Sequence, residues 1–270
     1  MFADLREGSV TLEDTTVDYA VFGKGQTPLV ILPGLSFRDV KGAGAGLALM
    51  YRIFWRDFRV YVLDKKAEIP ENCTVKALSE DTAQTMAALG IANAYVFGVS
   101  LGGMIAQRLA IDHPQLVRGL VLGVTASRTN ETLAHTVGRW IASVRRDAFG
   151  EIVSDMLEVM YSASYGKRYG WLFPILARFC MPKNKTRFLR LAKACLTCDT
   201  YEELHRIACP TLVLGGREDR IVTGEASAEI AERLVCEKAL RLWEGLGHAA
   251  YEEAKDFNAE ILSFLKQRIT

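Results

Sequence analysis

The stretch Tyr95–Met104, YVFGVSLGGM, places one serine between two glycines, each two residues away. An apolar, strand-like run precedes Ser100 and a helical pattern follows it, so the serine is expected at a sharp turn from strand to helix. Such a turn needs residues without a Cβ at Gly98 and Gly102, and it lifts the hydroxyl above the carboxyl edge of a sheet. The motif therefore predicts a nucleophilic serine; a glycine-rich connection with an incidental serine is the alternative.

A serine hydroxyl is a poor nucleophile at neutral pH and needs a base within hydrogen-bond reach. His248, in GLGHAAYEE, follows the last strand-like segment, so it is expected at the same sheet edge as Ser100. Of the other histidines, His113 precedes a proline at a helix end, and His135 and His205 lie in a segment without strands. We predict His248 as the base, with a structural histidine as the alternative.

The base in turn needs an acid that holds its tautomer and stabilises the imidazolium. GGREDRIV offers Glu218 and Asp219 in the loop after the penultimate strand-like segment. We predict Asp219, because the chain order is then serine, aspartate, histidine. Glu218 is the alternative and is expected to be a solvated loop carboxylate.

The elements that must position these side chains alternate along the sequence. Strand-like segments are expected at residues 15–23, 28–34, 58–65, 94–100, 119–125, 211–219 and 239–245. Helical patterns are expected at residues 76–91, 101–114, 224–234 and 254–269. Strands that alternate with helices predict an α/β fold, with a mostly parallel sheet covered by helices on both faces.

Residues 128–206 interrupt this rhythm, because they contain no strand-like run. They carry 13 Lys and Arg against 8 Asp and Glu, which could attract an anionic substrate or form a solvated helix face. Their aromatic residues include Trp140, Phe149, Tyr161, Tyr165, Tyr169, Trp171, Phe173, Phe179 and Phe188. We predict a helical cap at 128–206, inserted between two parts of one core, 1–127 and 207–270.

Composition excludes several classes of protein. The net charge of +1 gives no electrostatic signal for a nucleic-acid partner, and no apolar run is long enough for a membrane span. The first residues lack a signal-peptide pattern, so a cytoplasmic location with reduced thiols is expected. Cys195 and Cys198 form a single C-x-x-C, which we interpret as packing; a redox pair or half a zinc site is the alternative. We expect no metal and no cofactor, and no pattern indicates an oligomeric state.

Four segments together resemble the α/β-hydrolase fold family, in its lidded Ser-His-Asp form, which includes small esterases, enol-lactonases and carbon–carbon bond hydrolases. They are LPGLS at 32–36, GVSLGG at 98–103, GGREDRIV at 215–222 and GLGHAAYEE at 245–253. The resemblance covers essentially the whole chain. It implies an oxyanion hole made by the backbone N–H groups of Leu35 and Leu101.

Two departures from this family pattern concern the neighbourhood of that hole. Pro33 stands where many members have histidine, so the hydrogen bonding behind the hole should differ. DKKAEIPENCT, at 64–74, replaces the usual Asp-x-Arg-Gly-x-Gly-x-Ser, so the rim of the site should differ as well. Serine rather than aspartate at position 100 argues against the dehalogenase and epoxide-hydrolase branches.

The expected function is a serine hydrolase that cleaves a small ester, lactone or related acyl substrate through an acyl-enzyme. A carbon–carbon bond hydrolase or lyase that uses the same three side chains is one alternative. A binding protein of the same fold, without catalysis, is an alternative of a different class.

Overall fold

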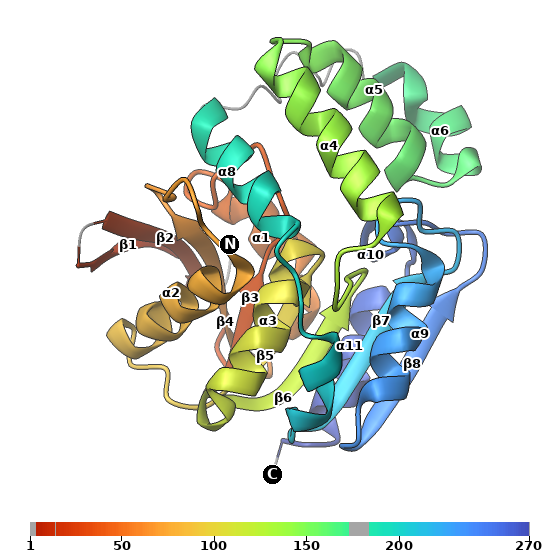
Figure 1. The fold of residues 1–270 in the computed structure, drawn as a ribbon. Coiled ribbons are helices and arrows are strands. Elements are labelled where there is room, and N and C mark those ends of the chain that lie inside the picture. Colours follow the sequence, from red (N-terminus) through yellow and green to blue (C-terminus); the bar gives the residue numbers. More distant parts are fainter. Residues whose placement is uncertain (1–3, 14, 173–183, 270) are drawn as a thin grey trace.

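The computed structural model describes residues 4–13, 15–172 and 184–269 (Figure 1). Its strands are β1 (Arg6–Leu12), β2 (Thr15–Phe22), β3 (Thr27–Leu32), β4 (Phe58–Lys66), β5 (Ala94–Val99), β6 (Val117–Gly123), β7 (Thr211–Gly216) and β8 (Lys238–Trp243). They form one sheet in the order β1-β2-β4-β3-β5-β6-β7-β8. Strands β3 to β8 pair in parallel, and β1 and β2 add an antiparallel edge. The predicted mostly parallel α/β sheet is confirmed.

Ten α-helices are described in these residues. They are α1 (Gly44–Met50), α2 (Val75–Ala88), α3 (Leu101–Asp112), α4 (Glu131–Arg145), α5 (Phe149–Met160), α6 (Ala163–Tyr169), α8 (Lys185–Cys195), α9 (Gly224–Arg233), α10 (Ala250–Glu253) and α11 (Phe257–Lys266). Short 3₁₀ helices occur at η1 (Arg52–Phe54), η2 (Pro114–Leu116), η3 (Gly170–Leu172) and η4 (Tyr201–Arg206). None of the helices in the described ranges has both the length and the hydropathy to cross a bilayer.

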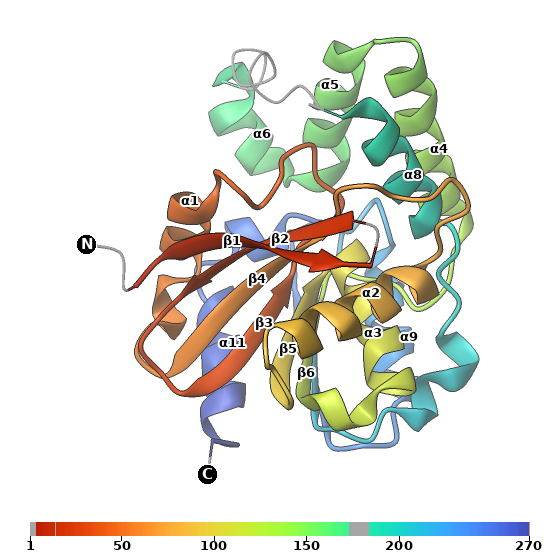
Figure 2. The same cartoon turned by 90° about the vertical axis from the view of Figure 1, so that its left-hand side faces the viewer.

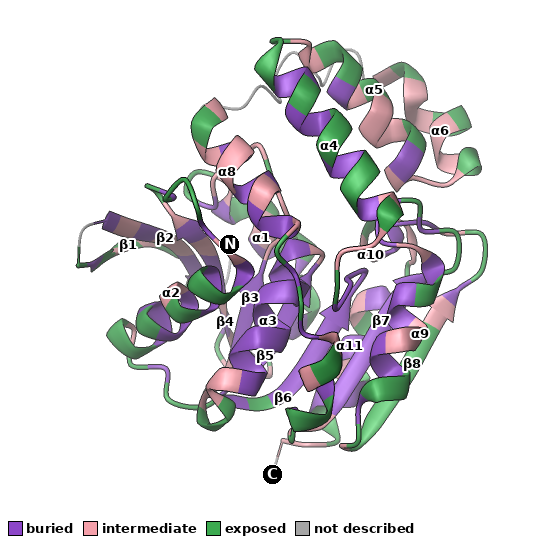
Figure 3. Cartoon of the chain, in the orientation of Figure 1, coloured by how far each residue is buried: buried purple, intermediate pink, exposed green. Residues whose placement is uncertain are grey.

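The central strands are buried on both faces because helices cover both. Figure 2 shows α1 and α11 on one face of the sheet and α2, α3 and α9 on the other. Along β3, Leu29 and Ile31 join the core on the α11 side, whereas Val30 and Leu32 join the core on the α3 side. The central strands are accordingly buried while the outer faces of the helices are exposed (Figure 3).

The segment without strand-like runs folds as helices above one edge of the sheet. Helices α4, α5, α6 and α8 gather there, over the carboxyl ends of the parallel strands (Figure 1). The two ends of this helical segment lie side by side, where Arg128 and Asp199 form an isolated antiparallel bridge. Around it, Thr200 N donates to Ser127 O at 2.7 Å and Thr129 N to Cys198 O at 3.1 Å. Phe173 and Phe179, named above among the aromatic residues of this segment, lie outside the described residues.

Candidate active site

Ser100 sits in a strained turn between β5 and α3. Its backbone angles are φ 53° and ψ −119°, in the left-handed half of the map that side-chain-bearing residues rarely adopt. Neighbouring strands hold it there: Ser100 N donates to Gly123 O at 2.9 Å, and Thr125 Oγ1 donates to Ser100 O at 2.7 Å. The fold therefore maintains a conformation that points this one side chain out of the sheet edge.

The flanking glycines are required because the turn packs backbone against backbone. A Cβ at Gly98 would lie 2.3 Å from the carbonyl oxygen of Gly102, and a Cβ at Gly102 would lie 1.9 Å from that of Leu32. Neither carbonyl can move without displacing β3 or α3. The spacing of glycine, serine and glycine is thus a steric requirement of this turn from β5 to α3, here called the elbow.

We expect Gly98→Ala to lower the free energy of unfolding by about 3 kcal/mol, since added methyl groups in packed interiors cost up to this amount. For a chain of this size that corresponds to a melting temperature about 6–12 °C lower, measurable by calorimetry. Gly138→Ala is the matched control, because a Cβ there, within α4, meets nothing within 4 Å. It should raise stability by about 0.5–1 kcal/mol, as alanine does in helices. Equal effects of the two substitutions would contradict this account of the elbow.

The imidazole of His248 lies between Ser100 and Asp219. Its Nδ1 is 2.8 Å from Asp219 Oδ2, and its Nε2 is 3.0 Å from Ser100 Oγ. An ionised carboxylate can only accept, so Nδ1 carries the proton and Nε2 is left to accept from the serine hydroxyl. His248 is 4 % exposed, so water competes little for these bonds.

Asp219 is fixed by the turn that carries it. Its Oδ1 accepts from the backbone N–H groups of Ile221, at 2.8 Å, and Val222, at 3.0 Å, which aims Oδ2 at the imidazole. The neighbouring Glu218 is exposed. The structure therefore brings Ser100, Asp219 and His248 together, and it leaves Glu218 in solvent, where the sequence analysis expected it.

The two residues predicted to form an oxyanion hole flank Ser100. Leu101 is the first residue of α3, where helical N–H groups have no partner within the helix. Leu35 follows Gly34, whose added Cβ would lie only 3.2 Å from Ser100 Cβ. Within the described ranges, neither the Leu35 nor the Leu101 N–H donates to a protein acceptor. Two donors are thus available beside the serine.

A cavity of about 210 Å³ opens next to Ser100 and His248. Its far wall comes from helices above the sheet edge: Leu133, Val137 and Trp140 of α4, Met156 and Met160 of α5, and Cys195 of α8. Helix α5 also contacts the loop that carries His248, because Ala249 N donates to Met160 O at 2.8 Å. The chamber is therefore mainly apolar, with polar groups from Ser36, Ser100, His248 and Tyr251.

The remaining histidines and the C-x-x-C pair lie in other environments. His113 Nε2 is 2.9 Å from Glu80 Oε2 at an exposed helix end, and His205 Nδ1 contacts the Glu202 carbonyl. Cys195 and Cys198 are buried free thiols that donate to different carbonyl oxygens, those of Leu191 and Ala126. Burial raises the pKa of both thiols to about 12, so neither is a ready thiolate.

The family model described as serine aminopeptidase, S33, matches residues 39–255, a span that includes Ser100, Asp219 and His248. The chain belongs to this family of α/β-hydrolases. A protein of Mycobacterium phage D29 named "Putative non-heme haloperoxidase" is 30% identical over 236 residues, covering 84% of this chain and 83% of the relative. A Pseudomonas sp. protein named 2-hydroxy-6-oxononadienedioate/2-hydroxy-6-oxononatrienedioate hydrolase is 28% identical and covers 77% of each chain. Relatives of this kind support a general hydrolase activity.

Solved structures of α/β-hydrolases share this fold at low sequence identity. The enol-lactonase from Burkholderia xenovorans LB400 superposes with a TM-score of 0.80 at 21% identity, over 96% of this chain and 100% of its own. At that identity the likeness shows the fold alone.

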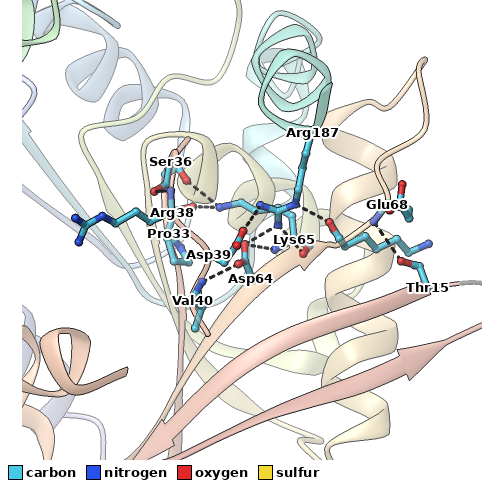
Figure 4. Close-up of polar contacts among 12 residues, drawn as sticks. Thr15, Pro33, Ser36, Arg38, Asp39, Val40, Asp64, Lys65, Glu68 and Arg187 are labelled. Carbon is cyan, nitrogen blue, oxygen red and sulfur yellow. Dashed lines mark hydrogen bonds and ion pairs between the residues drawn. The ribbon is translucent and has the colours of Figure 1, made fainter. Parts of the chain in front are cut away.

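Sequence reasoning missed a polar cluster at the rim of this α/β-hydrolase site. Lys65, Asp64 and Arg187 lie together behind the loop between β3 and α1, here called the Leu35 loop (Figure 4). The only sequence signal was the departure from the family pattern at residues 64–74, which indicated a different rim without saying what occupies it. Arg187 gave no signal, because it lies 123 positions from Asp64 in the chain.

Proposed function

We propose that this α/β-hydrolase cleaves a small ester, lactone or related acyl substrate through an acyl-enzyme formed on Ser100. One observation carries the proposal: a continuous chain of contacts runs from Asp219 through His248 to Ser100, at the wall of an apolar cavity. A buried carboxylate, an imidazole and a hydroxyl in this order form the arrangement that makes a serine nucleophilic. No metal or organic cofactor is required for this chemistry.

In the proposed reaction, His248 Nε2 takes the proton of Ser100 as Oγ attacks the substrate carbonyl carbon. The carbonyl π electrons move to oxygen, and the N–H groups of Leu35 and Leu101 bind the resulting oxyanion. The tetrahedral intermediate collapses, the bond to the leaving alcohol breaks, and His248 donates its proton to that group. Water then attacks the acyl-enzyme by the same steps and releases the acid.

The inserted helices are proposed to act as a cap that shapes the substrate chamber. Their contribution to the cavity wall and the bond from Ala249 to Met160 support this role. We place the end of the cap at Asp199, a few residues before the predicted Arg206, because η4 packs against α3 and α9 of the sheet domain. The division into a core and an inserted cap remains part of the proposal.

The size of the cavity favours short acyl groups. Each buried CH₂ contributes about 0.8 kcal/mol, or about fourfold in kcat/KM, until the chamber is full. A cavity of about 210 Å³ is small for a substrate pocket, so we expect kcat/KM for p-nitrophenyl esters to rise from acetate to butyrate and to fall by decanoate. Release of p-nitrophenolate measures this series.

Val137→Phe adds a ring to the cavity wall and should shift the preferred acyl group toward acetate. His135→Phe is the matched control, because it introduces the same phenyl ring, in place of an imidazole, at an exposed position of α4 and should leave the length preference unchanged. A preference for decanoate in the unaltered protein, or equal effects of the two variants, would argue against the proposed acyl chamber.

A carbon–carbon bond hydrolase is the second candidate, supported by the printed activity of the Pseudomonas sp. relative. The same imidazole could shuttle a proton to a carbon leaving group. Ser100 labelled by a fluorophosphonate, with no turnover of any ester or lactone in a panel, would favour this candidate. If the protein shows neither labelling nor turnover, that result would favour a binding protein.

A cytoplasmic location stays a prediction of the sequence.

A further inference from the structure

A buried lysine lies directly behind the loop that carries Leu35. Lys65, in β4, is 9 % exposed, and its Nζ donates to Gly34 O at 2.9 Å and to Pro33 O at 2.5 Å. Figure 4 shows the Lys65 side chain extended toward this loop. Its ammonium group therefore binds two successive backbone carbonyls next to the nucleophile.

One of these carbonyls belongs to the same peptide unit as the proposed oxyanion donor. The Gly34 C=O and the Leu35 N–H are the two ends of one planar trans peptide, so they point in opposite directions. Fixing the oxygen on Lys65 fixes the direction of the Leu35 N–H. A cation on the oxygen also polarises the peptide and makes its N–H a stronger donor.

The backbone around Lys65 is in turn held by the inserted helix α8. The Arg187 guanidinium donates to Asp64 Oδ1 at 2.9 Å, to Lys65 O at 2.8 Å and to Lys66 O at 2.9 Å (Figure 4). Asp64 Oδ2 accepts from Val40 N at 2.8 Å, at the far end of the same loop. The network thus ties the cap, the end of β4 and the Leu35 loop into one unit.

We propose that Lys65 is a positioning residue of the hydrolytic reaction, which aims and polarises the Gly34–Leu35 peptide so that its N–H meets the oxyanion formed at Ser100. The inference rests on the proposed function, since it requires Leu35 as an oxyanion donor. It also accounts for Pro33, which cannot supply the side-chain hydrogen bonds of the histidine found there in many relatives.

The charge of Lys65 responds to pH in an accessible range. Burial lowers the pKa of its ammonium group to about 8; among its neighbours, Asp64 opposes this shift, Arg187 adds to it and the Cys195 thiol opposes it. Arg38, Asp39 and Glu252 line the adjoining cavity of about 400 Å³. As the pH rises through about 8 the cation is lost, so kcat should decline there.

The test compares Lys65→Met with Lys65→Arg on p-nitrophenyl butyrate. We expect Lys65→Met to lower kcat by ~10–10²-fold, less than the ~10²–10³-fold of deleting an oxyanion donor, with KM nearly unchanged. Lys65→Arg should retain most of kcat, and its kcat should no longer decline near pH 8, because a guanidinium stays protonated. Affinity for a trifluoromethyl ketone, whose adduct carries an oxyanion, should fall in parallel with kcat in Lys65→Met.

Lys66→Met is the matched control, because this adjacent lysine of β4 pairs with Asp81 at 2.8 Å, away from the loop. Its kcat and pH profile should be those of the unaltered protein. Unaltered kcat in a folded Lys65→Met would overturn the inference. If that variant does not fold, a kcat decline near pH 8 that persists in Lys65→Arg overturns it.

Ser100→Ala separates the two proposals. Activity in Ser100→Ala refutes the proposed function. An inactive Ser100→Ala together with a fully active Lys65→Met refutes only the role of Lys65.

Discussion

Ser100→Ala is expected to lower kcat for p-nitrophenyl butyrate by at least ~10⁴-fold, because no other group in the proposed mechanism can form the acyl-enzyme. A residual rate above that of water is expected, since the oxyanion donors and the cavity remain. The protein should stay folded, because the elbow is held by backbone contacts to Gly123, Gly103 and Met104. Burst and steady-state release of p-nitrophenolate measure the loss of activity, and thermal melting measures whether the variant stays folded.

Ser36→Ala is the matched control, since Ser36 lines the same cavity. Its Oγ accepts from the Arg38 N–H at 3.0 Å, and the imidazole contacts Ser100 instead. We expect only a minor change in kcat. A fluorophosphonate should add its mass to the unaltered protein and to Ser36→Ala, but not to Ser100→Ala. Retained turnover and labelling in Ser100→Ala would reject the acyl-enzyme.

The part of the fold that the sequence predicted is the part with strong hydrophobic patterning. The seven expected strands correspond to β2 through β8, and the four expected helices to α2, α3, α9 and α11. Strand β1 was missed because it pairs only with β2 and is mostly exposed, so it has no apolar run. Helices α1 and α10 were missed because seven and four residues are too few for a helical period to be recognised.

The candidate site was predictable where local geometry restricts the residue type. At the elbow, contact between backbones demands glycine, so the motif can be recognised from residue types alone. The choice of Asp219 over Glu218 depended on chain order, and the structure distinguishes the two by burial and by the Ile221 and Val222 N–H groups. The three side chains lie together as expected, and their catalytic roles remain a prediction.

The Lys65 network could not be predicted, because it depends on contacts between distant segments. Lys65 and Lys66 are adjacent in the sequence, yet one binds the Leu35 loop and the other pairs with Asp81 on α2. Alternation along β4 sends the two side chains to opposite sides, but which side faces the site is decided by the sheet order. The order of the strands in the sheet is only weakly indicated by the sequence.

Asp219→Asn should lower kcat by ~10⁴-fold while the loop keeps its conformation, because the substitution reverses one hydrogen bond. The asparagine carbonyl can still accept from Ile221 N and Val222 N, but its NH₂ group then faces His248 Nδ1. A donor at that point favours the tautomer with its proton on Nε2. Nε2 then presents a hydrogen to the Ser100 hydroxyl and cannot accept its proton.

Glu218→Gln is the matched control for this carboxylate-to-amide change, because the neighbouring side chain is exposed and its backbone N–H donates to Leu246 O at 3.0 Å in either variant. It should retain kcat, whereas Asp219→Asn should lose both turnover and rapid fluorophosphonate labelling at an unchanged melting temperature. The comparison separates the tautomer argument from a general effect of lost negative charge. Similar losses in both variants, or turnover within tenfold of the unaltered protein in Asp219→Asn, would show that Asp219 does not set the proton on His248.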